Sequence, residues 1–199
     1  MRDYLAHEVR NVTVLGHSGA GKTGVLEAML YFTKASDRFG KTSEGSSLID
    51  YDPEEIKRGI TVYSTIVPIE WRDTKINFID TPGYLDFIGE AESGLAAGDN
   101  ALIVVGAKEG VQSGTQTAWE AAQSRKLPTI FFINKLDEEH ASFKKTYEGL
   151  REAFGKTVIP FEVPIVENGE VVGSINILRD KAWYFKGEKA NRDKACDVP

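Results

Sequence analysis

One glycine-rich run, Gly16 to Thr23, constrains the fold of this chain more than any other feature of the sequence. It reads GHSGAGKT and satisfies the phosphate-binding pattern G-x-x-x-x-G-K-[ST] in full. The run follows a short apolar strand at 11–15 and opens a predicted helix that extends from Lys22 to about residue 34. Glycines let the backbone wrap around a phosphate, and the helix N-terminus faces the same anion. We therefore interpret it as a phosphate site rather than a plain strand-to-helix turn.

The loop also supplies a predicted metal ligand. We expect Lys22 to reach the β- and γ-phosphates and the hydroxyl of Thr23 to bind Mg²⁺. The other residues that we expect to contact phosphate are His17, Ser18, Gly19, Ala20, Gly21 and, from a later motif, Gly83.

Strands and helices alternate through most of the sequence, which is typical of an α/β domain with a mostly parallel sheet. Predicted strands at 61–71 and 75–79 flank a turn so short that this pair must be antiparallel. Later strands at 101–105 and 129–133 are continuous apolar runs, as expected where helices cover both faces. Further helices are expected at 85–97, 112–124 and 141–154. The fold class is therefore α/β, a P-loop NTPase with a mixed, mostly parallel sheet flanked by helices.

Two segments depart from this alternation. Residues 35–59 are polar and show no convincing period, and a stretch of this length favours a functional loop. After Gly155 the sequence predicts consecutive strands at 157–166, 171–178 and 182–185, followed by a charged tail. We therefore divide the chain into a core at 1–156 and the beginning of a β-rich insert at 157–199.

Two short motifs are placed to complete the phosphate site. Asp80-Thr-Pro-Gly83 follows a strand, at the end where α/β sheets bind ligands. We expect Asp80 to hold Mg²⁺ through a water and the Gly83 N–H to bond the γ-phosphate. Arg58-Gly-Ile-Thr61 closes the polar segment, and Thr61 is expected to bind Mg²⁺ when the γ-phosphate is present. Loss of that phosphate would then release the loop, although each motif alone also fits a turn or a strand start.

Asn134-Lys-Leu-Asp137 ends another buried strand and predicts the base that is bound. Asp137 is suited to accept two N–H bonds from guanine, and Asn134 to contact the O6/N7 edge. The stem of Lys135 can lie across the base plane. Adenine offers no matching donors to the carboxylate, so the motif selects GTP over ATP. Alone, the motif could be a helix cap.

Taken in order, these four motifs resemble the G domain of translational GTPases, and most closely that of the elongation factor G family. Residues 52–58, 110–117 and 160–184 add to the resemblance, which covers nearly the whole chain. It implies a GTPase that uses Mg²⁺ and couples GTP hydrolysis to a conformational change on the ribosome. It also implies that residues after position 156 begin an insert of this family.

Two residues depart from the family pattern. Tyr84 stands where the family usually has a histidine that orients the attacking water, and Gly19 stands where it usually has aspartate. Both changes resemble the elongation-factor-G-like paralogues. The implied catalytic residues are Tyr84, Lys22 and Gly83. A phenol with a pKa near 10 replaces an imidazole poorly at neutral pH, so we expect very slow intrinsic hydrolysis that a partner stimulates. Alternatively, Tyr84 packs against its neighbours and is catalytically silent.

Charge and composition limit the remaining options. The net charge of −6 argues against a broad nucleic-acid-binding surface, but basic residues at positions 38, 41, 57 and 58 are compatible with a local RNA contact or a solvated loop. The sequence shows neither a membrane span nor a signal peptide, and Cys196 is the sole cysteine. We expect a monomeric chain in the cytoplasm, with GTP or GDP and the ribosome as partners.

The fifth motif of such domains, a Ser-Ala-like loop that supports guanine, is not found before Pro199. We therefore expect the chain to be the N-terminal part of a longer factor. Two alternatives to a ribosome-coupled GTPase stay open at this point: a GTP-dependent ribosome-binding switch with little catalysis, and a ribosomal protection or release-factor GTPase.

Overall fold

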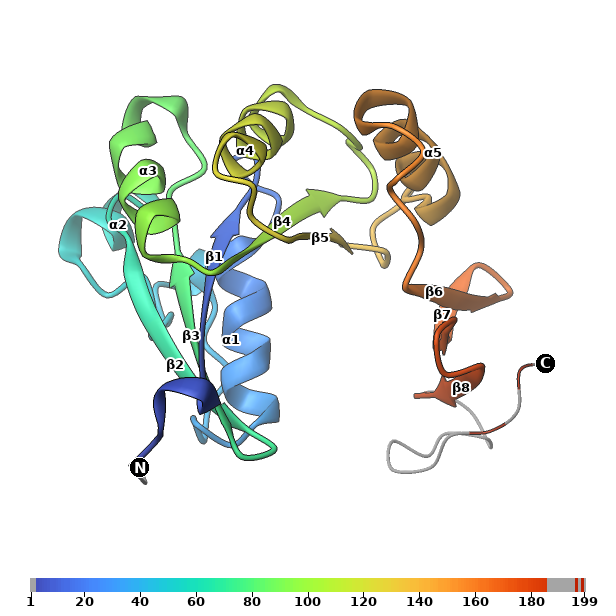
Figure 1. Cartoon of the computed structure of the whole chain (residues 1–199), viewed down its shortest axis with the longest axis horizontal. Coiled ribbons are helices and arrows are strands. Elements are labelled where there is room, and N and C mark those ends of the chain that lie inside the picture. The colour runs from blue at the N-terminus through green and yellow to red at the C-terminus, as the bar shows by residue number, and fades with distance from the viewer. Residues whose placement is uncertain (1–2, 186–195, 197, 199) are drawn as a thin grey trace. The chain divides into compact units, whose positions relative to one another are not determined.

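The computed structural model describes residues 3–185, 196 and 198, and the chain divides into two compact units (Figure 1). The first unit comprises residues 1–105 and 112–134, and the second comprises residues 106–111 and 135–199. The nucleotide motifs up to Asn134 all belong to the first unit.

A mixed five-stranded sheet with the order β2-β3-β1-β4-β5 organises the first unit. Its strands are β1 (Val9–Leu15), β2 (Thr65–Trp71), β3 (Thr74–Asp80), β4 (Asn100–Gly106) and β5 (Thr129–Asn134). Strand β1 pairs in parallel with both β3 and β4, whereas β2 is antiparallel to β3. The predicted α/β fold class with a mixed, mostly parallel sheet is confirmed.

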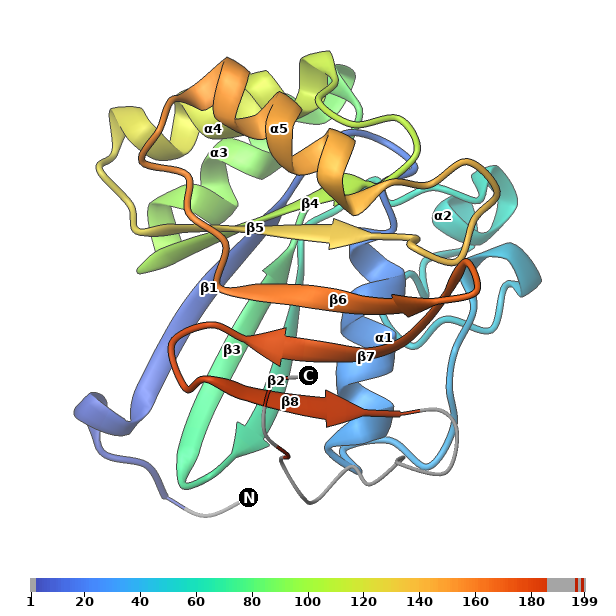
Figure 2. The ribbon, with the colours of Figure 1, turned by 90° about the vertical axis from the view of Figure 1, so that its right-hand side faces the viewer.

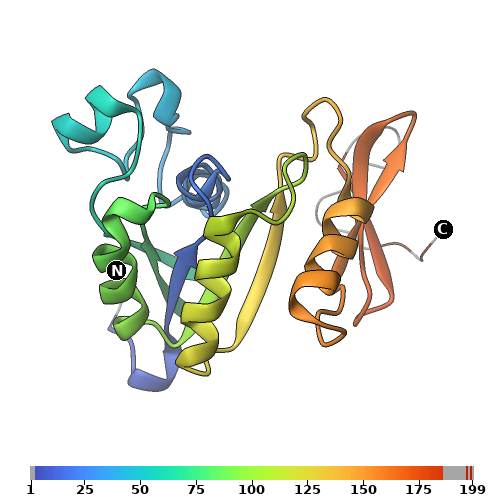
Figure 3. The same cartoon turned by 90° about the horizontal axis from the view of Figure 1, so that it is seen from above.

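Helices cover both faces of this sheet (Figure 3). Helix α1 (Lys22–Phe32) lies on one face, and α3 (Ile88–Ala97) and α4 (Ser113–Ser124) lie on the other. The core beneath α1 joins Val14 and Val104 of the central strands to Leu26 of the helix and Val67 of β2. Because β4 is covered on both sides, its residues 101–105 form a continuous apolar run in the sequence.

The turn between β2 and β3 consists of Arg72 and Asp73, which have φ angles of 45° and 64°. Positive φ at both central residues is typical of a type I′ hairpin turn, whose twist matches that of the flanking strands. The antiparallel pairing predicted from this short connection is therefore confirmed.

The polar segment predicted to be a loop at 35–59 contains two short helical elements. These are a 3-10 turn at Thr42–Glu44 and helix α2 (Pro53–Arg58). The prediction of a loop was wrong at α2, because Asp52 caps the helix, Pro53 occupies its first turn and Gly59 ends it in the left-handed conformation. A 3-10 turn at Leu85–Phe87 likewise precedes α3, where a single helix was predicted from residue 85.

Two predicted strands begin later than expected. Strand β2 begins at Thr65 rather than at residue 61, because side chains bind the N–H groups of residues 62, 63 and 64. In the second unit, β6 begins at Glu162 rather than at residue 157, and Pro160 has no N–H to offer a ladder there.

In its described part, the second unit combines one α-helix with a small antiparallel sheet (Figure 2). Helix α5 (Phe143–Phe154) is followed by β6 (Glu162–Glu167), β7 (Glu170–Asn176) and β8 (Lys181–Tyr184), which pair in that order. Helix α5 is tied to residues 106–111 because Thr146 Oγ1 donates to the carbonyl of Ala107 at 2.9 Å. The predicted charged tail lies outside the described residues except for Cys196 and Val198. Among the described residues, no helix is long and apolar enough to cross a membrane.

Candidate nucleotide and metal site

The glycine-rich loop connects β1 to α1 at the carboxyl edge of the sheet. Gly16 has a φ of 139°, and a Cβ there would lie 2.3 Å from the carbonyl oxygen of Val104. Gly21 immediately precedes α1 with a left-handed φ of 92°. A residue with a Cβ would be excluded at the first position and strained at the second, so both glycines are needed for the loop to turn into the helix.

Lys22 is almost fully buried within this loop. Its Nζ donates to the carbonyl oxygens of Gly16 at 3.2 Å and of His17 at 3.3 Å. The ammonium group is thus held over the centre of the loop by backbone acceptors. That is a suitable position from which to meet a phosphate, which would be a stronger acceptor than a carbonyl.

A cavity of about 340 Å³ opens beside the loop, and three separate segments of the first unit line it. Its lining residues are Ser18, Gly19, Gly21, Lys22, Thr23, Gly24, Thr42, Asp50, Gly59, Ile60, Thr61, Gly83 and Tyr84. Gly83 approaches the loop so closely that a Cβ there would lie 2.8 Å from the backbone of Ser18. The structure therefore brings the predicted residues of the first three motifs to one hollow.

The three predicted magnesium ligands are linked by short contacts: Thr23 and Thr61 line this hollow, and Asp80 is buried directly behind Thr23. Thr23 Oγ1 donates to Asp80 Oδ2 at 2.7 Å, and the hydroxyls of Thr23 and Thr61 are 3.1 Å apart. Asp80 is fully buried, and its second oxygen Oδ1 has no hydrogen-bond partner among the described residues. A buried carboxylate oxygen without a partner is costly, and hard oxygens are the ligands that Mg²⁺ prefers. The residues present therefore fit this ion.

Asp50 also lies in the hollow, although no sequence motif pointed to it. It is buried, its Oδ2 has no hydrogen-bond partner among the described residues, and its side chain contacts Thr61. The only signal in the sequence is the neighbouring Ile49, whose side chain is buried in the core and draws the segment inward. A second carboxylate thus faces the place where the predicted ligands meet.

Burial dominates the electrostatics of this cluster. Burial raises the pKa of Asp80 to about 7, against the lowering effects of its bond from Thr23 and of the charge on Lys22. Burial likewise raises the pKa of Asp50 to about 6. For Lys22, burial lowers the pKa, although Asp80 and Asp50 oppose the change. A divalent cation would favour both carboxylates in their charged form.

Tyr84 follows Gly83 and begins the 3-10 turn before α3. Its side chain is 43% exposed and lines both the large cavity and a smaller apolar pocket formed with Leu15, Pro82 and Leu95. The position is compatible with either predicted role, a place beside the phosphate loop from which water is oriented or silent packing against neighbours.

Two other loop positions have distinct surroundings. Gly19 is exposed with a φ of 77°, and a Cβ there would meet no atom within 4 Å. His17 faces α4, since its Nδ1 accepts the N–H of Gly114 at 3.3 Å. The imidazole therefore points to the helix, and only the backbone of His17 remains for the phosphate contact predicted for it.

The residues predicted to bind guanine are divided between the two units. Asn134 ends β5 in the first unit, and its Nδ2 donates to the carbonyl of Ala20 at 3.0 Å, which ties it to the phosphate loop. Lys135 and Asp137 belong to the second unit, where Lys135 pairs with Glu138 and Asp137 is exposed. Their joint contact with a base stays a prediction.

A P-loop on a mixed sheet, with threonine hydroxyls and a buried aspartate beside it, defines a nucleotide-binding domain of the P-loop class. Residues 7–191 match the family model described as the elongation factor Tu GTP binding domain. The chain belongs to this family. It is a GTP-binding domain of the elongation-factor-G-like translational GTPases, a family that hydrolyses GTP.

Curated relatives agree with this assignment. The chain is 37% identical over 182 residues to the mitochondrial ribosome-releasing factor 2 of Anopheles gambiae, covering 90% of this chain and 25% of that protein. It is 32% identical over 190 residues to elongation factor G of Mycoplasma pneumoniae, covering 96% and 28%. A crystal structure of a Thermus thermophilus protein matches with a TM-score of 0.88 and 36% identity, over 96% of this chain and 28% of that one. The chain thus spans about a quarter of the length of these relatives.

Proposed function

We propose that this chain binds GTP and GDP with Mg²⁺ and hydrolyses GTP in a ribosome-coupled conformational cycle. The observation that carries the proposal is the cluster of Thr23, Thr61 and Asp80, two of which line the same cavity as Lys22 while Asp80 accepts a hydrogen bond from Thr23. Names of relatives, elongation factor G among them, support the translational role.

In this proposal the phosphate loop binds the phosphates through its N–H groups and Lys22. Thr23 and Thr61 supply hydroxyl oxygens to Mg²⁺, and Asp80 holds the ion through a water. The ion would neutralise charge on the phosphates during hydrolysis. The N–H of Gly83 bonds the γ-phosphate, so Thr61 and Gly83 sense whether that phosphate is present.

Recognition of guanine is assigned to Asn134, Lys135 and Asp137. The bond from Asn134 to Ala20 supports this assignment, because it fixes the start of the motif to the loop that binds phosphate. Discrimination against ATP would come from the carboxylate of Asp137, which adenine cannot satisfy.

We further propose that Tyr84 makes hydrolysis slow in the isolated chain. A phenol near neutral pH neither accepts a proton from water nor carries a positive charge as readily as an imidazole. Turnover would then depend on a stimulating partner, for which the ribosome is the candidate.

Single-turnover hydrolysis of GTP, measured with and without ribosomes, tests the proposal. We expect tight GTP binding, slow hydrolysis alone and faster hydrolysis with ribosomes, and we expect Tyr84→His to speed the reaction in the isolated chain. Fast hydrolysis by the unmodified chain alone would refute the assignment of Tyr84. Failure to bind GTP in the presence of Mg²⁺ would refute the function itself.

Two alternatives follow from particular observations. Gly19 and Tyr84 in place of the family's usual residues favour a nucleotide-dependent ribosome-binding switch with little catalysis. Relatives named ribosome-releasing factor 2 favour a factor of the ribosome-releasing type. Ribosome binding with GTP, GDP and a non-hydrolysable analogue separates the switch from the ribosome-coupled GTPase, because a switch binds with GTP and does not turn over.

The organisation of the chain is also a proposal. We assign residues 1–156 to the GTPase core and residues 157–199 to the beginning of an insert, within a longer multidomain factor that acts in the cytoplasm. The shares of 23–28% that the chain covers in its relatives support the longer parent protein. The chain by itself would be monomeric.

A further inference from the structure

A buried carboxylate on α1 organises the segment that leads into the metal cluster. Glu27 is fully buried, and its two oxygens accept four hydrogen bonds, all from residues of one remote segment. Oε1 accepts from the hydroxyl of Ser47 at 2.7 Å and from the N–H groups of Leu48 and Ile49, and Oε2 accepts from the N–H of Gly40 at 3.2 Å. Glu27 thus binds the polar segment at both of its oxygens.

Ser47 links Glu27 to the backbone of residues 49 and 50 through hydrogen bonds. While its hydroxyl donates to Glu27, its oxygen accepts the N–H groups of Ile49 and Asp50, both at 3.1 Å. Ile49 then buries its side chain in the core under α1. Two successive hydrogen bonds, Ser47 to Glu27 and Asp50 N–H to Ser47, therefore fix the backbone at Asp50. The Asp50 side chain lies at the cavity.

Close packing at Gly40 shows how tightly this carboxylate is enclosed. A Cβ on Gly40 would lie 2.6 Å from Glu27 Oε2 and 2.8 Å from its carboxyl carbon. The segment can approach Glu27 in this way only because residue 40 has no side chain.

A second buried carboxylate acts on the other side of Asp50. Glu55 accepts the N–H groups of Val62 and Tyr63 at 3.0 and 3.1 Å, and its own carbonyl accepts those of Gly59 and Ile60. The residues on both sides of Thr61 therefore donate hydrogen bonds to Glu55. The segment from 40 to 63 is held by protein carboxylates at two points, before Asp50 and around Thr61.

We propose that Glu27 is a positioning residue for the magnesium site, which it serves by fixing residues 47–50 so that Asp50 faces the ion. This inference rests on the proposed binding of Mg²⁺ and nucleotide at the cavity. It assigns to Glu27 a contribution to metal-dependent nucleotide affinity, although Glu27 does not itself line the cavity.

The test compares nucleotide affinity with and without Mg²⁺ in the full chain. Outer residues that orient metal ligands typically change metal affinity by about 10- to 100-fold when replaced. Mg²⁺ should raise GDP affinity in the unmodified chain. In Glu27→Gln we expect this Mg²⁺-dependent increase to be smaller by at least about tenfold. With Mg²⁺ removed by excess chelator, the GDP affinity of Glu27→Gln should equal that of the unmodified chain, because the substitution leaves the phosphate loop unchanged. A residue that merely supported the fold would weaken both affinities equally.

A second variant and a second readout keep the test independent of folding. Ser47→Ala leaves Glu27 in place but removes the acceptor for the N–H groups of Ile49 and Asp50, and it should lower the same gain. Hydrogen exchange at residues 40–50 in the nucleotide-free protein should accelerate in both variants.

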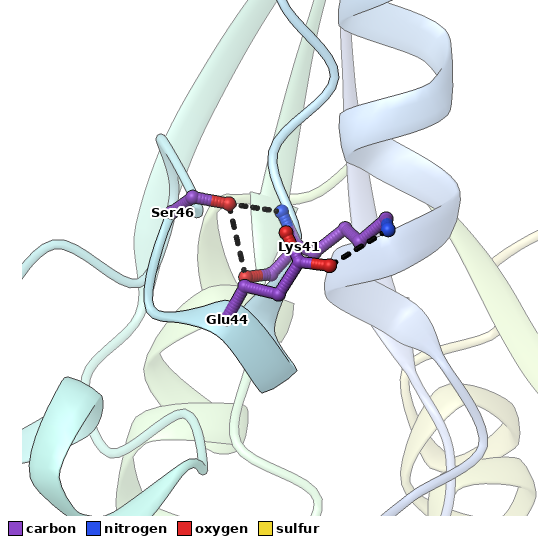
Figure 4. A network of polar contacts seen from close by, with 3 residues as sticks. All are labelled: Lys41, Glu44 and Ser46. Atoms are coloured by element: carbon purple, nitrogen blue, oxygen red, sulfur yellow. Dashed lines mark hydrogen bonds and ion pairs between the residues drawn. The ribbon is translucent and has the colours of Figure 1, made fainter.

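Glu44→Gln is the matched control, since it makes the same Glu-to-Gln change within the segment that Glu27 binds. Glu44 is exposed and pairs with Lys41, whose N–H bonds Ser46, so this network lies on the surface (Figure 4). The control should behave as the unmodified chain.

Two outcomes would count against different claims. If Glu27→Gln and Ser47→Ala both keep the full Mg²⁺-dependent gain, the role of Glu27 is overturned. If the unmodified chain shows no Mg²⁺-dependent nucleotide binding, the proposed function fails instead.

Discussion

At the scale of single residues, the site depends on side chains and glycines that leave no room for substitution. Lys22, Thr23 and Asp80 are buried beside one another, and Gly83 touches the loop that carries two of them. Such close contacts explain why the motifs specify residue types so strictly.

Gly83→Ala tests the close approach directly. The added Cβ would lie 2.3 Å from Lys22 Nζ and 2.8 Å from the Ser18 backbone, so the segment must move away from the phosphate loop. Loss of one bond to a charged phosphate costs roughly 1.5–3 kcal/mol, so GTP affinity should fall about tenfold or more while GDP affinity changes little. Equilibrium titration with both nucleotides measures the difference.

Gly89→Ala is the control for that change. Gly89 lies in α3, where a Cβ would meet no atom within 4 Å. Affinity for both nucleotides should be unchanged, and equal losses of GTP affinity in the two variants would refute the steric explanation.

At the scale of elements, helix ends decide where the chain turns toward the site. Helix α2 begins with Asp52-Pro53 and ends at Gly59, a sequence pattern that could have predicted it within the polar segment. Helix α4 ends differently, because Lys126 takes the left-handed conformation with a φ of 56°.

Lys126→Gly should stabilise the chain. Lys126 donates its N–H to the carbonyl of Gln123, and Leu127 donates to that of Ala122, the pattern of a Schellman ending in which glycine is favoured. Relief of the left-handed strain should raise the free energy of unfolding by about 1 kcal/mol. Denaturant unfolding measures this, and Lys126→Ala should give no comparable gain.

At the scale of the whole molecule, the buried carboxylates couple folding to pH. Burial raises the pKa of Asp80 from 3.8 to about 7 and that of Asp50 to about 6. The folded chain then holds these protons more tightly than the unfolded chain. Their contribution to stability is complete below pH 3.8 and is lost as the pH rises through 6 and 7.

The nucleotide-free protein should therefore become less stable from pH 5 to pH 8. Because one pKa unit corresponds to about 1.4 kcal/mol, the loss should reach about 2 kcal/mol or more. Denaturant unfolding across this range in the absence of Mg²⁺ measures it, and Asp80→Asn should flatten the dependence. An equally steep fall in that variant would contradict the role of Asp80. Burial lowers the pKa of Lys22, whose contribution runs in the opposite direction, so the difference between variants isolates the carboxyl.

The sequence by itself determined the fold class and predicted which residues form the phosphate and metal site. Those features are local: a loop between a strand and a helix needs its glycines, its lysine and its threonine within eight residues. The apolar run at 101–105 likewise predicted the buried strand β4. The run at 129–133 correctly predicted a strand, but the expectation that β5 is buried was wrong, because Ile130 and Phe132 are exposed.

Only the tertiary structure decided how the polar segment is held. Glu27, Glu55 and Asp50 belong to no motif, since a lone acidic residue in a sequence is normally solvated. Folding places Glu27 against residues 13 to 22 positions further along the chain and closes Glu55 on the residues around Thr61. Those contacts depend on where α1 and the polar segment meet in the folded chain. When two segments distant in the sequence bury a side chain between them, neither segment alone shows a sequence pattern that predicts the burial.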